Sequence, residues 1–143
     1  MQTVRDLLRA KGPEVHAVAP DAAVIDALRL MAQKGIGAVL VMEGRQLIGI
    51  LSERDYARKV VLHERSSAST PVTEIMTRGV VAVPPEAGVK ACLQILTDHR
   101  IRHLPVMEDG QIVGVVSIGD LVKAVIDEQR RELDQLQHYI VSG

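Results

Sequence analysis

The sequence predicts a mixed α/β fold of the α+β type, in which one β-α-β-β-α unit is used twice. Residues 15–61 align without a gap on residues 80–126, with sixteen identities over 47 positions. Within each copy, a segment of helical periodicity lies between short segments typical of strands. Half of a 143-residue chain would be only marginally stable alone, so we expect the two copies to pack on each other. Two copies make a duplicated domain, because a solenoid needs a longer array.

Each element follows from a local pattern. Alternating apolar residues predict the first strand, the 3.6-residue spacing predicts a helix, and a continuous apolar run predicts a strand covered on both faces. In the first copy these are a strand at 15–19, a helix from Asp21 to Gly35, strands at 36–42 and 46–51, and a helix from Ser52. In the second copy, Asp109-Gly110 favours a hairpin turn with positive φ.

The repeat divides the chain into residues 1–68, residues 69–126 and a C-terminal helical extension at 127–143. The lead-in at residues 1–14 loosely resembles VTEIM at 72–76, but at a different offset from that of the repeat. In the extension, apolar residues recur every seven positions at Ile126, Leu133 and Ile140, with Leu136 between the last two. This stripe predicts either packing against the body of the protein or a seam with a second subunit.

Composition argues against several classes of function. The formal net charge is −1, with 17 basic and 18 acidic residues, so no basic field is available for nucleic acid or an anionic membrane. The chain has two Tyr and no Phe or Trp, which leaves few platforms for base stacking. One cysteine excludes an internal disulfide framework. No signal-peptide pattern or membrane-length apolar run is present, so we expect a cytoplasmic protein.

The sequence also lacks the usual signatures of catalysis and of metal binding. Its five histidines show no zinc-ligand spacing, and its single cysteine has no general base that spacing can identify. We therefore expect no metal and no enzymatic activity.

A repeated motif carries the functional signal. Gly49–Asp55 reads GILSERD and Gly114–Asp120 reads GVVSIGD, so in each copy a serine starts a helix and an aspartate follows three residues later. Serine at the N-cap with an acidic residue at N3 is a capping box, which would explain both residues without a ligand. Capping boxes favour Glu or Gln at N3, yet both copies use Asp. The same carboxylate could accept hydrogen bonds from a ribose diol, and the free helix amides suit a phosphate.

These motifs resemble those of a tandem pair of CBS domains, an arrangement called a Bateman module. The resemblance covers roughly residues 1–126 and includes LPVM at 104–107 and EIMT at 74–77. The segments SERDYARKV (52–60) and SSAST (66–70) further resemble small stand-alone bacterial CBS-pair proteins. The resemblance implies two units packed sheet to sheet about a pseudo-twofold axis, with two clefts that bind adenosine-containing ligands.

The resemblance assigns roles to individual residues. In each cleft an aspartate would take the ribose hydroxyls, a serine would lie near phosphate, and an aliphatic residue would contact adenine. These pairs are Asp55 and Asp120, Ser52 and Ser117, and Ile50 and Val115. Residues before the LPV strand are expected to reach the cleft of the opposite aspartate. The Asp55 cleft would then receive cations from Arg102 and His103 with Arg54 and Arg58, and the Asp120 cleft would receive Gly37 and Ala38.

Two functions remain after this comparison. In the first, AMP, ATP, NAD or S-adenosylmethionine binds as a regulatory ligand, and a conformational change passes the signal to a partner protein. In the second, the chain is a ligand-free dimerisation scaffold whose Ser-x-x-Asp motifs are only helix caps. In both cases a homodimer is expected, formed through the helical faces at 56–61 and 121–126.

Overall fold

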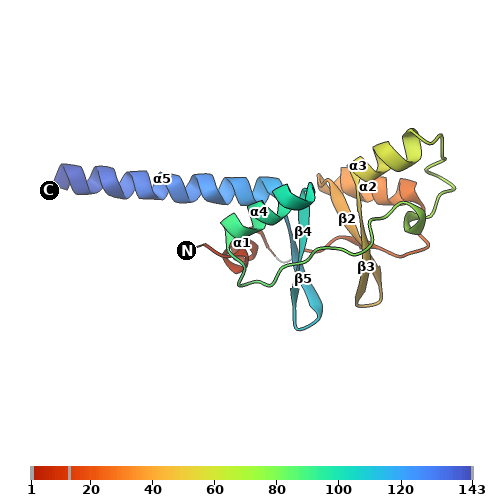
Figure 1. Ribbon diagram of the computed structural model, residues 1–143, viewed down its shortest axis with the longest axis horizontal. Coiled ribbons are helices and arrows are strands. Elements are labelled where there is room, and N and C mark those ends of the chain that lie inside the picture. The colour runs from red at the N-terminus through yellow and green to blue at the C-terminus, as the bar shows by residue number, and fades with distance from the viewer. Residues whose placement is uncertain (1, 13, 143) are drawn as a thin grey trace. The chain divides into compact units, whose positions relative to one another are not determined.

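The computed structural model describes residues 2–12 and 14–142 and contains the predicted unit twice (Figure 1). The first copy forms β1 (Ala17–Val18), α2 (Val24–Lys34), β2 (Ala38–Glu43), β3 (Gln46–Ser52) and α3 (Glu53–Tyr56), which continues as a π-helical turn, η1 (Ala57–Val61). The second copy forms α4 (Val89–His99), β4 (His103–Glu108), β5 (Gln111–Ser117) and α5 (Ile118–Ser142). Helix α1 (Val4–Lys11) and the 3-10 helix η2 (Val72–Glu74) precede the two copies. The predicted α+β class is confirmed.

The two sheets differ by one strand, because a proline stands in the second copy. In the first copy β1 runs parallel to β2, which pairs antiparallel with β3. The Leu40 N–H there donates to the His16 carbonyl at 3.0 Å. Pro105 takes the place of Leu40 in the second copy and has no N–H to donate. The strand predicted near residue 83 is therefore reduced to a single parallel bridge between Val83 and Val106, beside the two-stranded β4–β5 sheet.

The helix ends and the hairpin turn follow their sequence signals. Gly35 ends α2 in the left-handed conformation, with φ of 63°. Arg100 ends α4 in the same conformation, with φ of 55°, although a side chain there is less favourable than glycine. Asp109 and Gly110 have φ of 53° and 76°, which confirms the predicted positive-φ turn.

The chain folds into two compact units, and neither is continuous in sequence. The copy-1 unit contains Glu14–Val81 and Asp109–Ile112, and the copy-2 unit contains Met1–Pro13, Ala82–Glu108 and Val113–Gly143. The predicted boundary at residue 68 separates the two sequence repeats, whereas each compact unit contains residues from both sides of that boundary. The first lead-in, with α1, belongs to the copy-2 unit, while η2, which leads into the second copy, belongs to the copy-1 unit.

The two lead-ins make equivalent contacts in their units. The Val72 N–H donates to the Ala22 carbonyl at 2.9 Å, and the Val4 N–H donates to the Ala87 carbonyl at 2.9 Å. Ala87 is the repeat counterpart of Ala22. The resemblance between the lead-ins thus has a structural counterpart. The spacing between the two lead-ins can differ from that of the repeat, because both lead-ins lie outside the segments that align without a gap.

A glycine in each copy admits the side chain of the lead-in. A Cβ atom added at Gly49 would lie 2.5 Å from the Met76 sulfur, and one added at Gly114 would lie 2.6 Å from a Leu8 methyl carbon. Such distances are shorter than any van der Waals contact. Each lead-in therefore seats an apolar side chain directly against β3 or β5.

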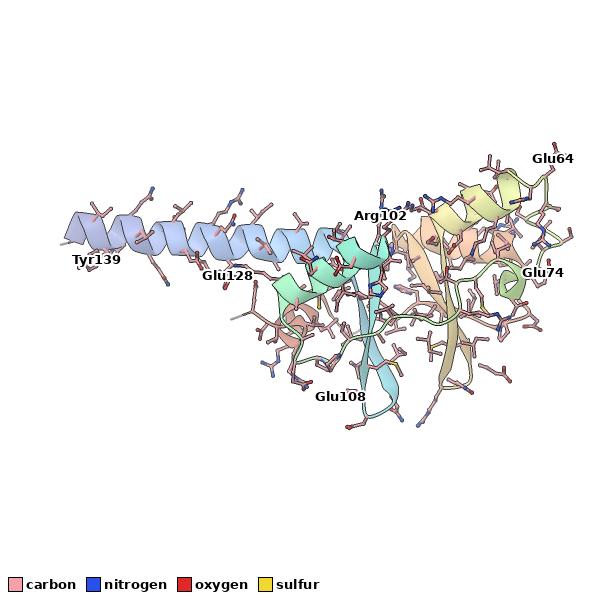
Figure 2. All side chains as sticks on the ribbon, viewed as in Figure 1. Glu64, Glu74, Arg102, Glu108, Glu128 and Tyr139 are labelled. Carbon is pink, nitrogen blue, oxygen red and sulfur yellow. The ribbon has the colours of Figure 1, made fainter. Side chains whose placement is uncertain are left out.

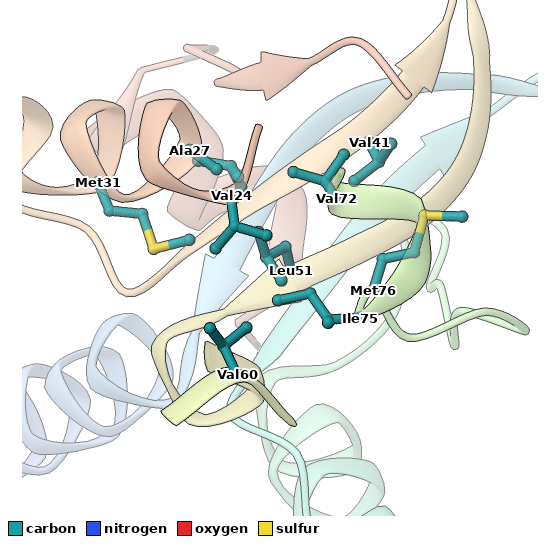
Figure 3. Packing of buried hydrophobic residues seen from close by; sticks show 10 residues of the cluster. Val24, Ala27, Met31, Val41, Leu51, Val60, Val72, Ile75 and Met76 are labelled. Carbon is teal, nitrogen blue, oxygen red and sulfur yellow. The ribbon is translucent and has the colours of Figure 1, made fainter. Parts of the chain in front are cut away.

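The core of the copy-1 unit shows how far the lead-in contributes (Figure 3). Val72, Ile75 and Met76 of the η2 segment are at most 6 % exposed. They belong to the same cluster as residues from α2, β2, β3 and η1, namely Val24, Ala27, Met31, Val39, Val41, Leu51 and Val60. The η2 segment is thus part of this core.

Among the described residues, no helix is both long and apolar enough to cross a membrane.

Candidate functional site

The first repeated motif lies at the junction between β3 and α3, which we call the Asp55 corner. The Ser52 hydroxyl accepts the Asp55 N–H at 3.1 Å, and Asp55 Oδ2 accepts the Ser52 N–H at 3.0 Å. These reciprocal bonds form a complete capping box. The Glu53 N–H, another free donor of the helix start, is taken by the Gly37 carbonyl at 3.0 Å. Three N–H groups at this helix start, those of Ser52, Glu53 and Asp55, are thus bonded within the protein itself.

Both carboxylate oxygens of Asp55 are engaged. Oδ2 also accepts the Ser52 hydroxyl, while Oδ1 accepts the Thr77 hydroxyl at 3.3 Å and lies 3.2 Å from the Lys59 ammonium. Lys59 donates in addition to the Ile75 carbonyl at 3.0 Å. The Asp55 side chain is only 14 % exposed. A diol could reach this carboxylate only by displacing Thr77 or Lys59.

The second motif lies between β5 and α5, which we call the Asp120 corner. Asp120 Oδ2 accepts the Ser117 N–H at 2.8 Å, and the Ser117 hydroxyl accepts the Asp120 N–H at 3.1 Å. The Ile118 N–H donates to the Arg102 carbonyl at 2.8 Å. This arrangement repeats that of the Asp55 corner, with Arg102 in the place of Gly37.

The Asp120 carboxylate is more open than that of Asp55. Lys11, from α1, lies 2.7 Å from Oδ2 and also donates to the Val115 carbonyl at 2.9 Å. The other oxygen, Oδ1, accepts no hydrogen bond from any residue within 2–12 or 14–142. The Asp120 side chain is 28 % exposed, twice the fraction of Asp55. The Asp120 carboxylate is therefore less enclosed by protein contacts than that of Asp55.

The ionisation of Asp120 and His103 reflects this charge cluster. Burial acts to raise the pKa of Asp120, but hydrogen bonds from Lys11 and Ser117 outweigh it and hold the pKa below its usual value. Burial lowers the pKa of His103, and the positive charge of Lys11 lowers it further. At neutral pH the corner thus holds a carboxylate, an ammonium and a neutral imidazole.

The structure places the predicted residues in two groups, one in each unit. Those of the copy-1 unit are Gly37, Ala38, Ile50, Ser52, Arg54, Asp55 and Arg58, and those of the copy-2 unit are Arg102, His103, Val115, Ser117 and Asp120. Within their own unit, Gly37 adjoins the Asp55 corner and Arg102 adjoins the Asp120 corner through their carbonyls. Their predicted reach to the opposite aspartate stays a prediction. Arg54 is half-buried and Arg58 is exposed.

Lys11, Lys59 and Thr77 contact the two aspartates but are not among the residues predicted from the sequence. Lys59 lies four residues after Asp55, a spacing that brings helical side chains together, so it was open to prediction. Lys11 and Thr77 come from the exchanged lead-ins, and no local pattern indicated which copy they would join. The use of Asp instead of Glu at N3 no longer argues against a pure capping role. In both copies the shorter side chain reaches the N-cap N–H at 3.0 Å or less.

Comparison with known families now identifies the architecture. A family model described as the CBS domain matches residues 4–62 and again residues 72–127. The chain belongs to the CBS-domain family. CBS-domain proteins generally act as regulatory or signal-transduction modules, and the predicted tandem pair is confirmed.

Several CBS-domain proteins resemble the chain over most of its length. CBS domain-containing protein CBSX3, mitochondrial, from Arabidopsis thaliana is 42% identical over 99% of this chain and 73% of its own length. CBS domain-containing protein YhcV from Bacillus subtilis strain 168 is 33% identical over 85% of this chain and 84% of its own. The solved structure of a candidate signal-transduction protein with CBS domains from Burkholderia ambifaria MC40-6 has a TM-score of 0.87 and 50% identity, covering 90% of this chain and 96% of that one. These relatives are CBS-domain proteins without a named enzymatic activity. A cytoplasmic location stays a prediction, since one of them is named as mitochondrial.

Proposed function

We propose that this CBS pair is a regulatory module that binds an adenosine-containing ligand at its Ser-x-x-Asp corners. The candidate ligands are AMP, ATP, NAD and S-adenosylmethionine. The observation that carries the proposal is the pairing, in both copies, of a carboxylate with an ammonium at the start of a helix: Asp55 with Lys59, and Asp120 with Lys11. A carboxylate can accept both hydroxyls of a ribose, and an ammonium can hold a phosphate. At the Asp120 corner, the positive end of the dipole of the long helix α5 favours the same anion.

The two corners are not equivalent. The family resemblance favours the Asp55 corner for a phosphate, on the expectation that Arg102 and His103 reach it. Geometry favours the Asp120 corner for the diol, because its Oδ1 is free of hydrogen bonds to the described residues and its side chain is more exposed. We therefore propose Asp120 as the first corner to fill. His103, neutral at pH 7 and part of the same cluster, would lie beside the ligand without opposing it.

Binding at the Asp120 corner requires little rearrangement energy. The Lys11–Asp120 ion pair joins side chains that are 40% and 28% exposed. Ion pairs that are so open to water contribute only about 0–1 kcal/mol. A ligand with micromolar affinity gains about 8 kcal/mol on binding. Lys11 can consequently turn from the carboxylate to a ligand phosphate at small cost.

A ligand-free scaffold is the second candidate, and one observation favours it. Both capping boxes are complete without any ligand, so Ser52, Asp55, Ser117 and Asp120 all have a structural role already. Under this reading the aspartates stabilise helix starts and nothing more.

The chain contains its own control for this question. Thr3 and Asp6 form a third capping box at the start of α1, where the Thr3 N–H donates to Asp6 Oδ2 at 3.0 Å. This box lies outside the repeated motif. Asp6→Ala therefore measures the loss of a cap alone, which should cost about 1 kcal/mol. Asp55→Ala and Asp120→Ala remove a cap and, if the proposal holds, a ligand contact as well.

The test is a thermal-shift series with AMP, ATP, NAD and S-adenosylmethionine, followed by calorimetry for any ligand that responds. A ligand at about 100 times its Kd should stabilise the wild type by about 2.7 kcal/mol, which corresponds to roughly 5–10 °C in Tm. The shift should persist in Asp6→Ala and be lost in Asp120→Ala. If the Tm shift is lost only in Asp55→Ala, the ligand binds at the Asp55 corner instead, and the proposed function still holds. No shift with any ligand would support the scaffold instead, and equal shifts in all variants would refute these corners as the binding site.

Signalling requires that the ligand prefer one conformation or one partner-bound state over another. The coupling between two such sites is typically about 1–3 kcal/mol. We propose that the bound ligand biases the contact of this module with a downstream protein. Hydrogen exchange with and without the responding ligand should then show changes beyond the corner itself.

A further inference from the structure

His103 lies within a group of charged side chains at the Asp120 corner. It is half-buried at the start of β4, and Arg102 directly precedes it (Figure 2). The Arg102 carbonyl accepts the Ile118 N–H at 2.8 Å, so this end of β4 adjoins the first turn of α5. Lys11, from α1, lies 2.7 Å from Asp120 Oδ2 and completes the group. Three segments that are far apart in the sequence thus bring their charges together within one unit.

The charges that act on His103 are predominantly positive. Burial disfavours the protonated form of its ring most strongly, and the positive charges of Lys11 and Arg102 disfavour it further. Asp120 favours the protonated form. Two cations thus oppose one carboxylate, and in the free protein the imidazole stays neutral at pH 7.

Other titratable groups near β4 do not change this balance. Strand β5, with the sequence QIVGVVS, has no titratable residue. Glu108, at the opposite end of β4, is paired with Arg5. The titratable residues of α4 are Lys90, Cys92, Asp98 and His99. The protonation of His103 therefore responds to its burial and to the charges of the corner itself.

An anion at the corner would reverse the balance of charge around His103. A phosphate group carries about −1.5 to −2 charges at pH 7, which outweighs the excess of one cation over the carboxylate. A nearby opposite charge favours the charged form of a titratable group. The proton that burial and the two cations exclude from His103 in the free protein would then be bound.

We propose that an anionic ligand binds at the Asp120 corner together with a proton, which His103 takes up. This inference rests on the proposed function and adds a preference among its ligands. AMP, ATP and NAD carry phosphate groups, whereas S-adenosylmethionine carries a positive sulfonium, so proton uptake favours the three phosphate-bearing ligands.

Linkage fixes the direction of the pH dependence. A ligand that strengthens proton binding is itself bound more tightly when the proton is present. The pKa of His103 in the free protein lies below about 6.5, and the bound anion raises it. Affinity should therefore rise as the pH falls from about 7 and should level off below the pKa of the free protein.

The first experiment uses sulfate as the anion, because its charge is constant near neutral pH. An NMR titration of the full chain measures the pKa of each histidine in sodium sulfate and in sodium chloride of equal ionic strength, so that screening is the same. Sulfate should raise the pKa of His103 by at least about 0.5 relative to chloride. His63, which is exposed in the copy-1 unit, is the internal control and should respond equally to both salts. A response of His103 no larger than that of His63 would overturn the proposal.

A pair of lysine and arginine variants locates the effect. Lys11→Met removes the cation that acts most strongly on His103, so it should raise the pKa of His103 in chloride and reduce the response to sulfate. Arg9→Met is the matched control, since it removes an exposed cation from the same last turn of α1 and keeps the Lys11–Asp120 pair. Circular dichroism should show that both variants stay folded. Equal pKa values and equal sulfate responses in the two variants would contradict an anion site at this corner.

The second experiment measures the affinity for sulfate from the backbone amide shifts of the first turn of α5. The wild type should bind sulfate at least about threefold more tightly at about pH 5.5 than at about pH 7.5, because only the lower pH supplies the proton. His103→Gln cannot take up this proton and should lose the increase. No increase in the wild type, or the same increase in His103→Gln, would refute the role of His103.

These outcomes are separate from those that test the proposed function. If an adenosine-containing ligand shifts the Tm while His103 does not respond to sulfate, the proposed function holds and this inference fails. If His103 takes up a proton with sulfate while no adenosine-containing ligand shifts the Tm, the proton-linked anion site holds and the adenosine ligand is refuted.

Discussion

The exchange of lead-ins makes a prediction about which part of the protein a core substitution weakens. Val4 and Val72 begin the two lead-in helices, and both are 0% exposed. Val4→Ala and Val72→Ala each remove two buried methyl groups, worth about 1.6 kcal/mol in transfer free energy. The cavity left behind adds to this, so we expect roughly 2–3 kcal/mol of destabilisation for each variant.

The location of the loss is the sharper part of the prediction. Under native conditions, hydrogen exchange followed by mass spectrometry reports local and sub-global opening along the chain. Val4→Ala should speed exchange in α4, β4 and β5, although it lies in the lead-in to the first copy. Val72→Ala should speed exchange in α2, β2 and β3.

A surface substitution provides the baseline for both variants. Leu62 is 75% exposed, so Leu62→Ala should change stability by no more than about 0.5 kcal/mol. Faster exchange in β2 and β3 for Val4→Ala, or the same pattern for both core variants, would refute the assignment of each lead-in to one unit.

Two further predictions concern the glycines under the lead-ins and the half-buried His103. Gly49→Ala should destabilise the protein by about 1–3 kcal/mol, because its Cβ would meet the buried Met76 and also the Thr77 carbonyl at 3.1 Å. Gly114→Ala should destabilise it less, since its Cβ would meet only the flexible side chain of Leu8. Urea unfolding would measure the free energy of unfolding of both variants. The folded-state pKa of His103 lies below its unfolded value of about 6.5, so the unfolded state binds more protons and stability falls as the pH drops below about 6.5. His103→Gln should flatten this dependence in denaturation curves between about pH 5 and 7; an unchanged slope would show that other groups cause it.

The sequence alone determined the features that arise within a few residues of one another. The two copies, the order of their elements and the Asp109-Gly110 turn could all be predicted, because periodicity and turn preference are local. The capping geometry at Ser52 and Asp55 was also predictable, since those groups are three residues apart. Pro105 indicates the missing strand, because a proline has no N–H to donate at the position where Leu40 bonds its neighbouring strand.

Only the tertiary structure decided which lead-in joins which copy. Val4 and Val72 are both apolar and would satisfy either core, so their local sequence contains no preference. That choice brings Lys11 to Asp120 and Thr77 to Asp55, and it leaves one aspartate more open than the other. The tertiary structure also decided that the apolar stripe of α5, at Ile126, Leu133, Leu136 and Ile140, stays exposed. Burial depends on what packs against a helix, and the spacing of the helix's own residues does not determine it.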